Sequence, residues 1–116
     1  LRINQLLGIW NGTLVAIYKD VASLRPKFLY GIDTKTGERG YRINLDNTFS
    51  KAILVQDKIV IFTDSGLKIL NAKDGKPLTY YSAVLHGNPR SLMIHENVLL
   101  ATATIKGSTE IQMLKF

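Results

Sequence analysis

Cysteine is absent from this sequence, and tryptophan, proline and acidic residues are few. The absence of cysteine excludes disulfide bonds, thiolate metal sites and a cysteine nucleophile. Long apolar runs are absent as well, because the longest, such as Lys58–Thr63 and Val98–Ala103, fall far short of the ~20 residues that a membrane-spanning helix needs. The rest of the composition, with 46% hydrophobic and 21% charged residues, is that of an ordinary globular domain.

The shortage of acidic residues gives the chain a net positive charge. It has 15 lysines and arginines against 9 acidic residues, a formal charge of +6. A basic surface favours anionic partners such as nucleic acid, anionic lipid or an acidic protein. The same charge also serves solubility alone, which is the more common reason for it. Charge therefore keeps nucleic acid as an alternative partner without selecting it.

Short apolar segments separated by turn residues make up most of the chain. Asn11-Gly12 is a strong hairpin signal, because both residues accept the positive φ angles of a type I′ turn. Pro26 excludes a central strand at its position, since proline has no N–H to donate. Segments at such short and regular spacing are typical of a sandwich, a barrel or a propeller. We expect no helix and eleven strands: Ile3–Trp10, Thr13–Tyr18, Phe28–Asp33, Glu38–Leu45, Ser50–Val55, Lys58–Thr63, Leu67–Asn71, Lys76–Ala83, Arg90–Ile94, Val98–Thr104 and Thr109–Phe116.

Two stretches of the chain repeat each other. Leu29–Arg39 (LYGIDTKTGER) and Leu67–Pro77 (LKILNAKDGKP) each run from an apolar strand into a polar turn closed by glycine. In such turns Asp or Asn bonds the backbone ahead of it, and glycine takes the positive φ. The structural turn residues are Asp33 matched with Asn71 and Gly37 matched with Gly75, both pairs 38 residues apart (71 − 33 and 75 − 37). A self-similar period of this size indicates a repeat architecture.

Four-stranded antiparallel meanders of about forty residues are the blades of β-propellers. We therefore predict an all-β fold, a partial β-propeller of about 2.75 blades that forms one unit over residues 1–116. The expected blades are residues 3–45, 50–83 and 90–116. A propeller closes only as a ring, commonly of about four to eight blades. We expect this chain to be a segment of a larger propeller; the alternative is that several copies complete a ring together.

The repeated stretch resembles the repeat of pyrroloquinoline-quinone-type (PQQ-type) β-propellers, which typically reads L-Y-A-L-D-A-K-T-G-K-x-x-W. The residues of the first cycle that fit it are Leu29, Tyr30, Ile32, Asp33, Lys35, Thr36, Gly37 and Glu38. Those of the second cycle are Leu67, Ala72, Lys73, Gly75 and Lys76, with Asn71 in place of the aspartate. The aromatic after the glycine, usually tryptophan, is Tyr41 in the first cycle, and its place falls at Thr79, next to Tyr80, in the second.

The resemblance has consequences for function. Quinone dehydrogenases of this family need a complete ring, a calcium site and an acidic base beside the cofactor, and none of these can be placed in this sequence. Members of the broader family without a cofactor act as extracytoplasmic scaffolds, assembly factors and stress sensors. The resemblance therefore implies a scaffold without a cofactor and, more weakly, an extracytoplasmic location. Fold alone does not settle function.

No residue pattern in the chain indicates catalysis. His86 and His95 lack the spacing of a metal pair. Asp57, Asp64 and Asp74 stand in predicted turns, where aspartate bonds the backbone. The serines near glycine, Ser65 and Ser108, lack a G-x-S-x-G elbow. We expect no catalytic, cofactor-binding or metal-binding residues.

Two further patterns are candidates for a modification site and a binding site. Asn11-Gly12-Thr13 is an N-glycosylation sequon, although the type I′ turn alone explains its Asn-Gly. Cations beside aromatic rings are how single-stranded nucleic acid is bound. The basic residues in this arrangement are Arg25, Lys27, Arg39 and Arg42, near Phe28, Tyr30 and Tyr41.

We expect the protein to be a non-catalytic scaffold for protein–protein interaction. Loops such as Lys19–Lys27 and Leu85–Arg90 are its expected contact surfaces, because propellers present loops from a rigid body. The alternatives are a basic module that binds an anionic polymer such as nucleic acid, and a fragment of a quinone-dependent enzyme. Ile3–Trp10 and Thr109–Phe116 are expected at sheet edges that something covers, since long open edges invite association.

Overall fold

The computed structural model describes residues 2–19, 27–45, 49–63, 66–82 and 89–116. These residues form antiparallel β-strands and no helix, which confirms the prediction of an all-β fold. The strands are β1 Arg2–Trp10, β2 Thr13–Lys19, β3 Lys27–Asp33, β4 Arg39–Leu45, β5 Phe49–Val55, β6 Lys58–Thr63, β7 Gly66–Asn71, β8 Pro77–Ser82, β9 Pro89–His95, β10 Val98–Ile105 and β11 Ser108–Lys115. Pro77 and Pro89 each open a strand, the place where a missing N–H does least harm to the ladder.

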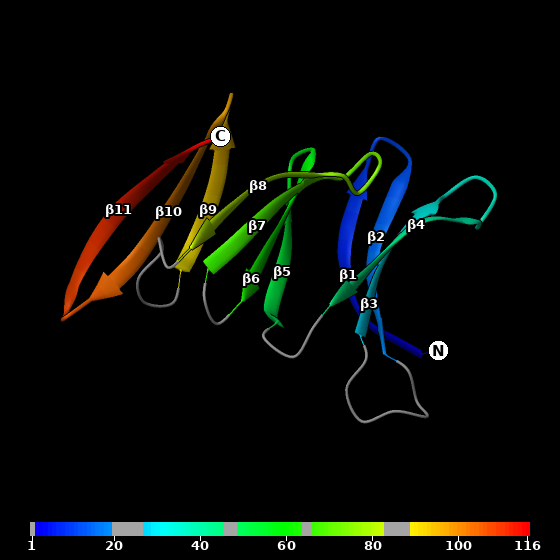
Figure 1. Ribbon diagram of the computed structural model, residues 1–116, viewed down its shortest axis with the longest axis horizontal. Coiled ribbons are helices and arrows are strands. Elements are labelled where there is room, and N and C mark those ends of the chain that lie inside the picture. The colour runs from blue at the N-terminus through cyan, green and yellow to red at the C-terminus, as the bar shows by residue number, and fades with distance from the viewer. Residues whose placement is uncertain (1, 20–26, 46–48, 64–65, 83–88) are drawn as a thin grey trace.

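The strands form three meanders in which neighbours along the chain pair antiparallel. The first sheet has the order β1-β2-β3-β4, the middle sheet β5-β6-β7-β8 and the third sheet β9-β10-β11. Figure 1 shows the three sheets standing side by side, with the middle sheet between the other two. The opening strands lie next to one another, since β1 contacts β5 and β5 contacts β9.

The core is built on both faces of the middle sheet. Alternate residues of β6 point to opposite faces, as the two-residue period of a strand requires. Ile59 and Ile61 pack toward the first sheet, whereas Val60 and Phe62 pack toward the third. Each buried aliphatic side chain contributes roughly 1.5–3 kcal/mol to folding. The middle sheet therefore needs a neighbour on each side.

Each neighbouring sheet supplies the other half of one core. Between the first and middle sheets the buried residues are Val15, Ile17, Leu29, Leu45, Ala52, Ile59, Ile61, Leu70 and Ala72. Between the middle and third sheets they are Val60, Phe62, Leu67, Ile69, Ile94, Leu99 and Leu114. Tyr41, Ile43 and Leu45 share one face of β4, because alternate residues of a strand point the same way, and all three pack toward the first of these cores.

The repeated turns have matching hydrogen bonds. Gly37 N donates to Asp33 O at 2.7 Å, and Gly75 N donates to Asn71 O at 2.8 Å. Both glycines have positive φ, +75° for Gly37 and +73° for Gly75. Lys35 N also donates to Asp33 Oδ1 at 2.8 Å, whereas in the second turn Lys76 N donates to Asp74 Oδ1 at 3.0 Å. The four residues singled out in the sequence thus lie in turns of the same geometry.

Tyr41 locks the first sheet to the turn of the middle sheet. Its hydroxyl donates a hydrogen bond to Ala72 O at 2.6 Å. Its ring fills the space beside two glycines, because a Cβ added at Gly31 or Gly75 would lie 2.2 Å or 2.5 Å from a ring carbon. The Tyr41 ring thus fits at this place because neither Gly31 nor Gly75 has a side chain.

We expect alanine to cost more at Gly75 than at Gly37. The two glycines have nearly the same φ, so alanine should lose about 1–2 kcal/mol of unfolding free energy at either one from the left-handed backbone alone. At Gly37 no atom lies within 4 Å of the new Cβ, whereas at Gly75 the Tyr41 ring blocks it. Overpacking should add about 1–3 kcal/mol at Gly75. Urea unfolding of the two variants measures the difference.

The control is the same pair of substitutions in a Tyr41→Ala background. Because the ring is then gone, the two losses should become equal, and the double-mutant cycle isolates the contact between Tyr41 and Gly75. Equal losses in the wild-type background would contradict this interlock.

Candidate functional site

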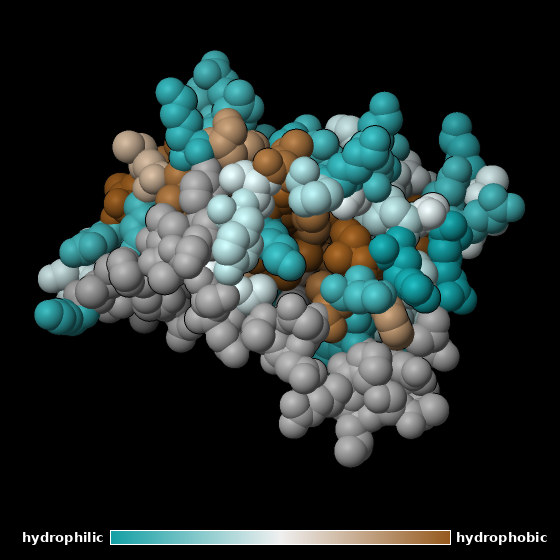
Figure 2. Space-filling view, in the orientation of Figure 1, coloured by the Kyte–Doolittle hydropathy of each residue, from teal (hydrophilic) through white to brown (hydrophobic). Residues whose placement is uncertain are grey.

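The described chain has a cleft between the first and middle sheets. It has a volume of about 530 Å³, within the ~300–1,000 Å³ typical of ligand-binding pockets. Figure 2 shows hydrophobic surface in the middle of the viewed face, between the first and middle sheets, framed by hydrophilic side chains. The residues that line it include Ile43 and Leu45 of β4, Ile61 of β6, Lys68 and Leu70 of β7, and Tyr80 of β8.

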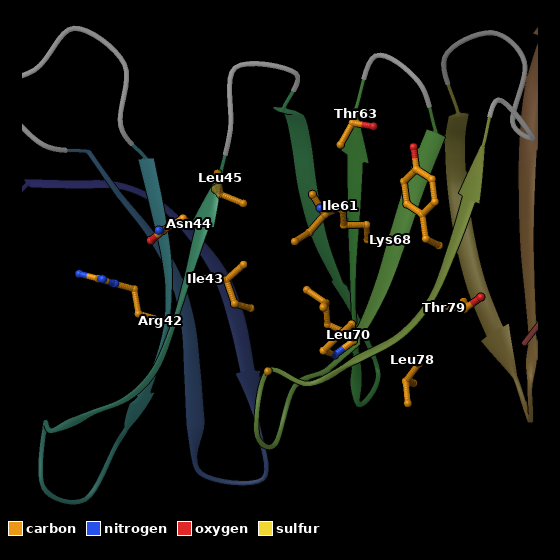
Figure 3. A pocket seen from close by; sticks show the side chains of 13 residues that line it. Arg42, Ile43, Asn44, Leu45, Ile61, Thr63, Lys68, Leu70, Leu78 and Thr79 are labelled. Atoms are coloured by element: carbon orange, nitrogen blue, oxygen red, sulfur yellow. The ribbon is translucent and has the colours of Figure 1, made fainter.

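One wall of the cleft is the edge of β4. This strand ends the order of the first sheet and pairs only with β3. Four consecutive residues, 42–45, line the cleft. Ile43 and Leu45 point across it, whereas Arg42 points away (Figure 3), with its guanidinium 5.2 Å from the centre of the Phe28 ring. The backbone of Arg42 therefore lies at the cleft while its guanidinium does not, and β4, as the end strand of its sheet, has an unpaired edge beside the cavity.

The opposite wall carries one cation. Lys68 lies opposite Ile61 on one side and Tyr80 on the other, so these three side chains form a row on the cleft face of the middle sheet. Lys68 is exposed, and no described residue forms an ion pair with it. None of the described residues that line the cleft is acidic. The cleft therefore combines apolar walls with an uncompensated positive charge.

The predicted cluster of basic and aromatic residues is brought together only in part. Arg39 lies over the Tyr30 ring at 4.9 Å from its centre, and over Tyr18 at 5.7 Å. Tyr18 meets Tyr30 edge to face at 5.2 Å. Tyr41, by contrast, packs on the opposite face of the first sheet. Sequence reasoning missed Tyr18, although its alternation with Val15 and Ile17 along β2 places it on the outer face.

The arginines already cover these rings. Stacking of Arg39 and Arg42 on aromatic faces gives each about 0.5–1 kcal/mol where solvent is near. A nucleic-acid base would have to displace a guanidinium in order to stack there. The arrangement therefore has a complete structural explanation in packing of the first sheet. Of the other basic residues in the predicted cluster, Lys27 opens β3, and Arg25 lies outside the described residues.

The remaining candidates are spread over separate turns. Asn11 is exposed, and its φ of +47° with +80° at Gly12 matches the turn predicted there. Asp57 forms an ion pair with Lys58 at 2.8 Å. His95 lies 4.0 Å from Glu96, and both side chains are exposed. The Asp74 carboxylate accepts the hydrogen bond from Lys76 N within its turn, as described above. His86, Asp64, Ser65 and most of the loops 19–27 and 85–90 lie outside the described residues.

Two searches of the described residues give negative results. Those residues contain no group of three or more His, Asp or Glu side chains placed to hold a metal ion. They also contain no helix long and apolar enough to cross a membrane. Ser108 is the first residue of β11, next to the turn in which Lys106 and Gly107 have positive φ.

Comparison of the chain with protein-family models and with curated protein sequences gives no match. Its interpretation therefore depends on its own residues and geometry.

The ionisable side chain of Tyr41 lies next to the cleft. It contacts Gly75, and Gly75 lines the cavity. Burial of the phenol, with a smaller effect from the Asp74 carboxylate, raises the pKa of Tyr41 to about 12. Both causes disfavour the phenolate. The neutral hydroxyl is the form that donates to Ala72 O.

We expect the protein to lose stability in alkaline solution through Tyr41. In the unfolded chain a tyrosine ionises near pH ~10, while in the folded chain the pKa of Tyr41 is about 12. The contribution of the neutral hydroxyl is therefore complete below the unfolded value and is lost as the pH rises through the folded one. Urea unfolding at a series of pH values measures this slope.

Tyr41→Phe is the matched control. It should lose about 1 kcal/mol at neutral pH, because the bond to Ala72 O is removed. It should also lack the part of the alkaline slope that Tyr41 causes. An identical pH dependence in both proteins would contradict this assignment.

Proposed function

We propose that this chain is a non-catalytic segment of a β-propeller and acts as a scaffold for protein–protein contact. The observation that carries the proposal is the contrast between the middle sheet and the end sheets. The middle sheet is covered on both faces, whereas each end sheet carries exposed apolar side chains on its outer face. Exposed apolar faces of this kind mark interfaces.

On the first sheet the exposed apolar side chains lie along β1, on the outer face. Ile3, Leu6 and Ile9 of β1 pair with Tyr18, Ala16 and Leu14 of β2, so they share the face opposite Val15 and Ile17. These three β1 residues are 53–64% exposed. Such side chains gain free energy by burial, at roughly 25 cal/mol per Å².

The third sheet also has exposed apolar side chains on its outer face. Met93, Leu100 and Met113 form one row across β9, β10 and β11, and Thr102 pairs with Ile111 in the next. Met93, Ile111 and Met113 are 59–72% exposed. Their neighbours Ile94, Leu99 and Leu114 point the other way, into the core against the middle sheet.

A propeller explains why both end faces are apolar. In a ring of blades every sheet packs between two others, and the middle sheet already has this environment. Side-by-side sheets with adjacent opening strands fit such a ring, and so does the resemblance of Leu29–Arg39 to the PQQ-type repeat. The end faces would then contact further blades, in the same polypeptide, in a copy or in a partner protein.

We expect this chain to associate through its end faces. Light scattering at micromolar concentration should give a mass above the 13.0 kDa of one chain. Leu6→Lys and Met113→Lys should each weaken association tenfold or more, because a charge on either face opposes burial. Ser108→Lys is the matched control, since it adds the same charge at an exposed residue next to a hairpin turn. A wild-type monomer that also binds no hydrophobic dye would contradict the proposal.

A basic module for an anionic polymer is the second candidate, favoured by the net charge of +6 and by Arg39 and Arg42 on one face. Under the scaffold proposal, binding of a fluorescent single-stranded oligonucleotide should be weak and should disappear near ~150 mM salt. Retained affinity at that salt concentration, with a tenfold loss on Arg39→Ala, would instead support the second candidate. Lys106→Ala, at a hairpin tip, controls for the loss of one charge.

A further inference from the structure

We propose that the cleft between the first and middle sheets binds an extended peptide that adds as a strand to β4 and directs a carboxylate side chain to Lys68. This interaction goes beyond the end-face contacts of the proposed function. The peptide site rests on the proposed function only in treating the chain as a scaffold. It requires the first and middle sheets alone. Three observations support the proposal together, namely the cleft, the unpaired edge of β4 and the position of Lys68.

The open edge selects a peptide over a compact ligand. Residues 42–45 of the end strand β4 all line the cleft, although the guanidinium of Arg42 lies on Phe28 at the other face. An edge strand presents unpaired N–H and C=O groups. An extended segment laid beside it can pair with them, which is the general mode of recognition by strand addition. Four residues of edge give a contact length of ~13 Å at ~3.3 Å per residue.

The walls select the side chains of that peptide. Ile43 and Leu45 face Ile61 and Leu70 across the cavity, so apolar side chains of the peptide would be buried between the two sheets. In a strand, alternate side chains point the same way. The side chains that enter the cleft are therefore every second one along the peptide.

Lys68 selects the charge of the central inward residue. In β7 it lies between Gly66 and Leu70. Gly66 pairs with Thr63 of β6, and both Thr63 and Leu70 line the cleft, so the row of Lys68 is in the middle of the cleft rather than at an end. No acidic side chain among the described lining residues competes for it. A carboxylate between two apolar inward residues would meet the ammonium, and the partly closed walls would strengthen the attraction relative to open solvent. The partner is thus an extended segment with inward residues of the order apolar, acidic, apolar.

The test uses the full chain and a blocked, fluorescein-labelled peptide, Thr-Val-Thr-Glu-Thr-Val-Thr, measured by fluorescence anisotropy. Saturable binding is expected, and Lys68→Glu should weaken it tenfold or more. The same peptide with Lys in place of Glu should bind Lys68→Glu better than it binds the wild type. Lys35→Glu is the matched control, because it makes the same charge change at an exposed place in the first repeated turn. It should leave the affinity unchanged within about twofold.

Strand addition has its own test. N–H groups of alternate residues in a strand point to the same edge. Of two peptides N-methylated at odd or at even positions, one should lose binding tenfold or more and the other should keep it. Met113→Lys should bind the peptide like the wild type, which separates this site from association through the end faces.

Several outcomes would overturn the inference. They are no saturable binding at millimolar peptide, equal affinities of the wild type and Lys68→Glu, and equal affinities of both N-methylated peptides. Binding of dodecanoate in the absence of peptide binding would overturn it as well, because the cleft would then accept a single-chain amphiphilic anion.

Discussion

Burial of the middle sheet on both of its faces is the constraint on which the rest of this structure depends. β6 carries apolar side chains at four successive positions, Ile59 to Phe62, and a strand directs them alternately to opposite sides. Neither set can be covered by the sheet itself. The first and third sheets are therefore held at fixed places by the cores they complete. The outer faces of the first and third sheets carry apolar side chains too, and burial would stabilise these as well.

The contact between the first and middle sheets is specific as well as apolar. Tyr41 reaches from β4 into the turn that follows β7 and is seated against Gly75 by its ring and on Ala72 O by its hydroxyl. One aromatic residue thus ties a strand of one repeat to the turn of the next. Past Gly75 the two sheets leave the cleft between them, bounded farther along by Leu45 and Thr63. The same junction therefore both fixes the sheets and sets where the cleft begins.

The polar features of the chain divide into those with structural partners and those without. Arg39 and Arg42 lie on aromatic rings, and Lys58 is paired with Asp57, so packing accounts for them. Lys68 is different, because it is the single charge in an apolar strand and lies beside an open cleft. For this reason a binding role is better supported at Lys68 than at the more conspicuous cluster of arginines and aromatics.

The sequence by itself determined the strands and the turns, because these depend on local periodicity and on the φ angles that Asn and Gly accept. The first and last residue of every predicted strand lie within one residue of those observed. Only the tertiary structure decided which faces meet, since that depends on contacts between residues far apart in the chain. The seat of Tyr41 on Gly75, the separation of Tyr41 from Tyr30, and the place of Lys68 opposite the edge of β4 all belong to this class. The lone lysine in GLKILN was a visible signal, but its role depends on a neighbouring sheet that local pattern does not specify.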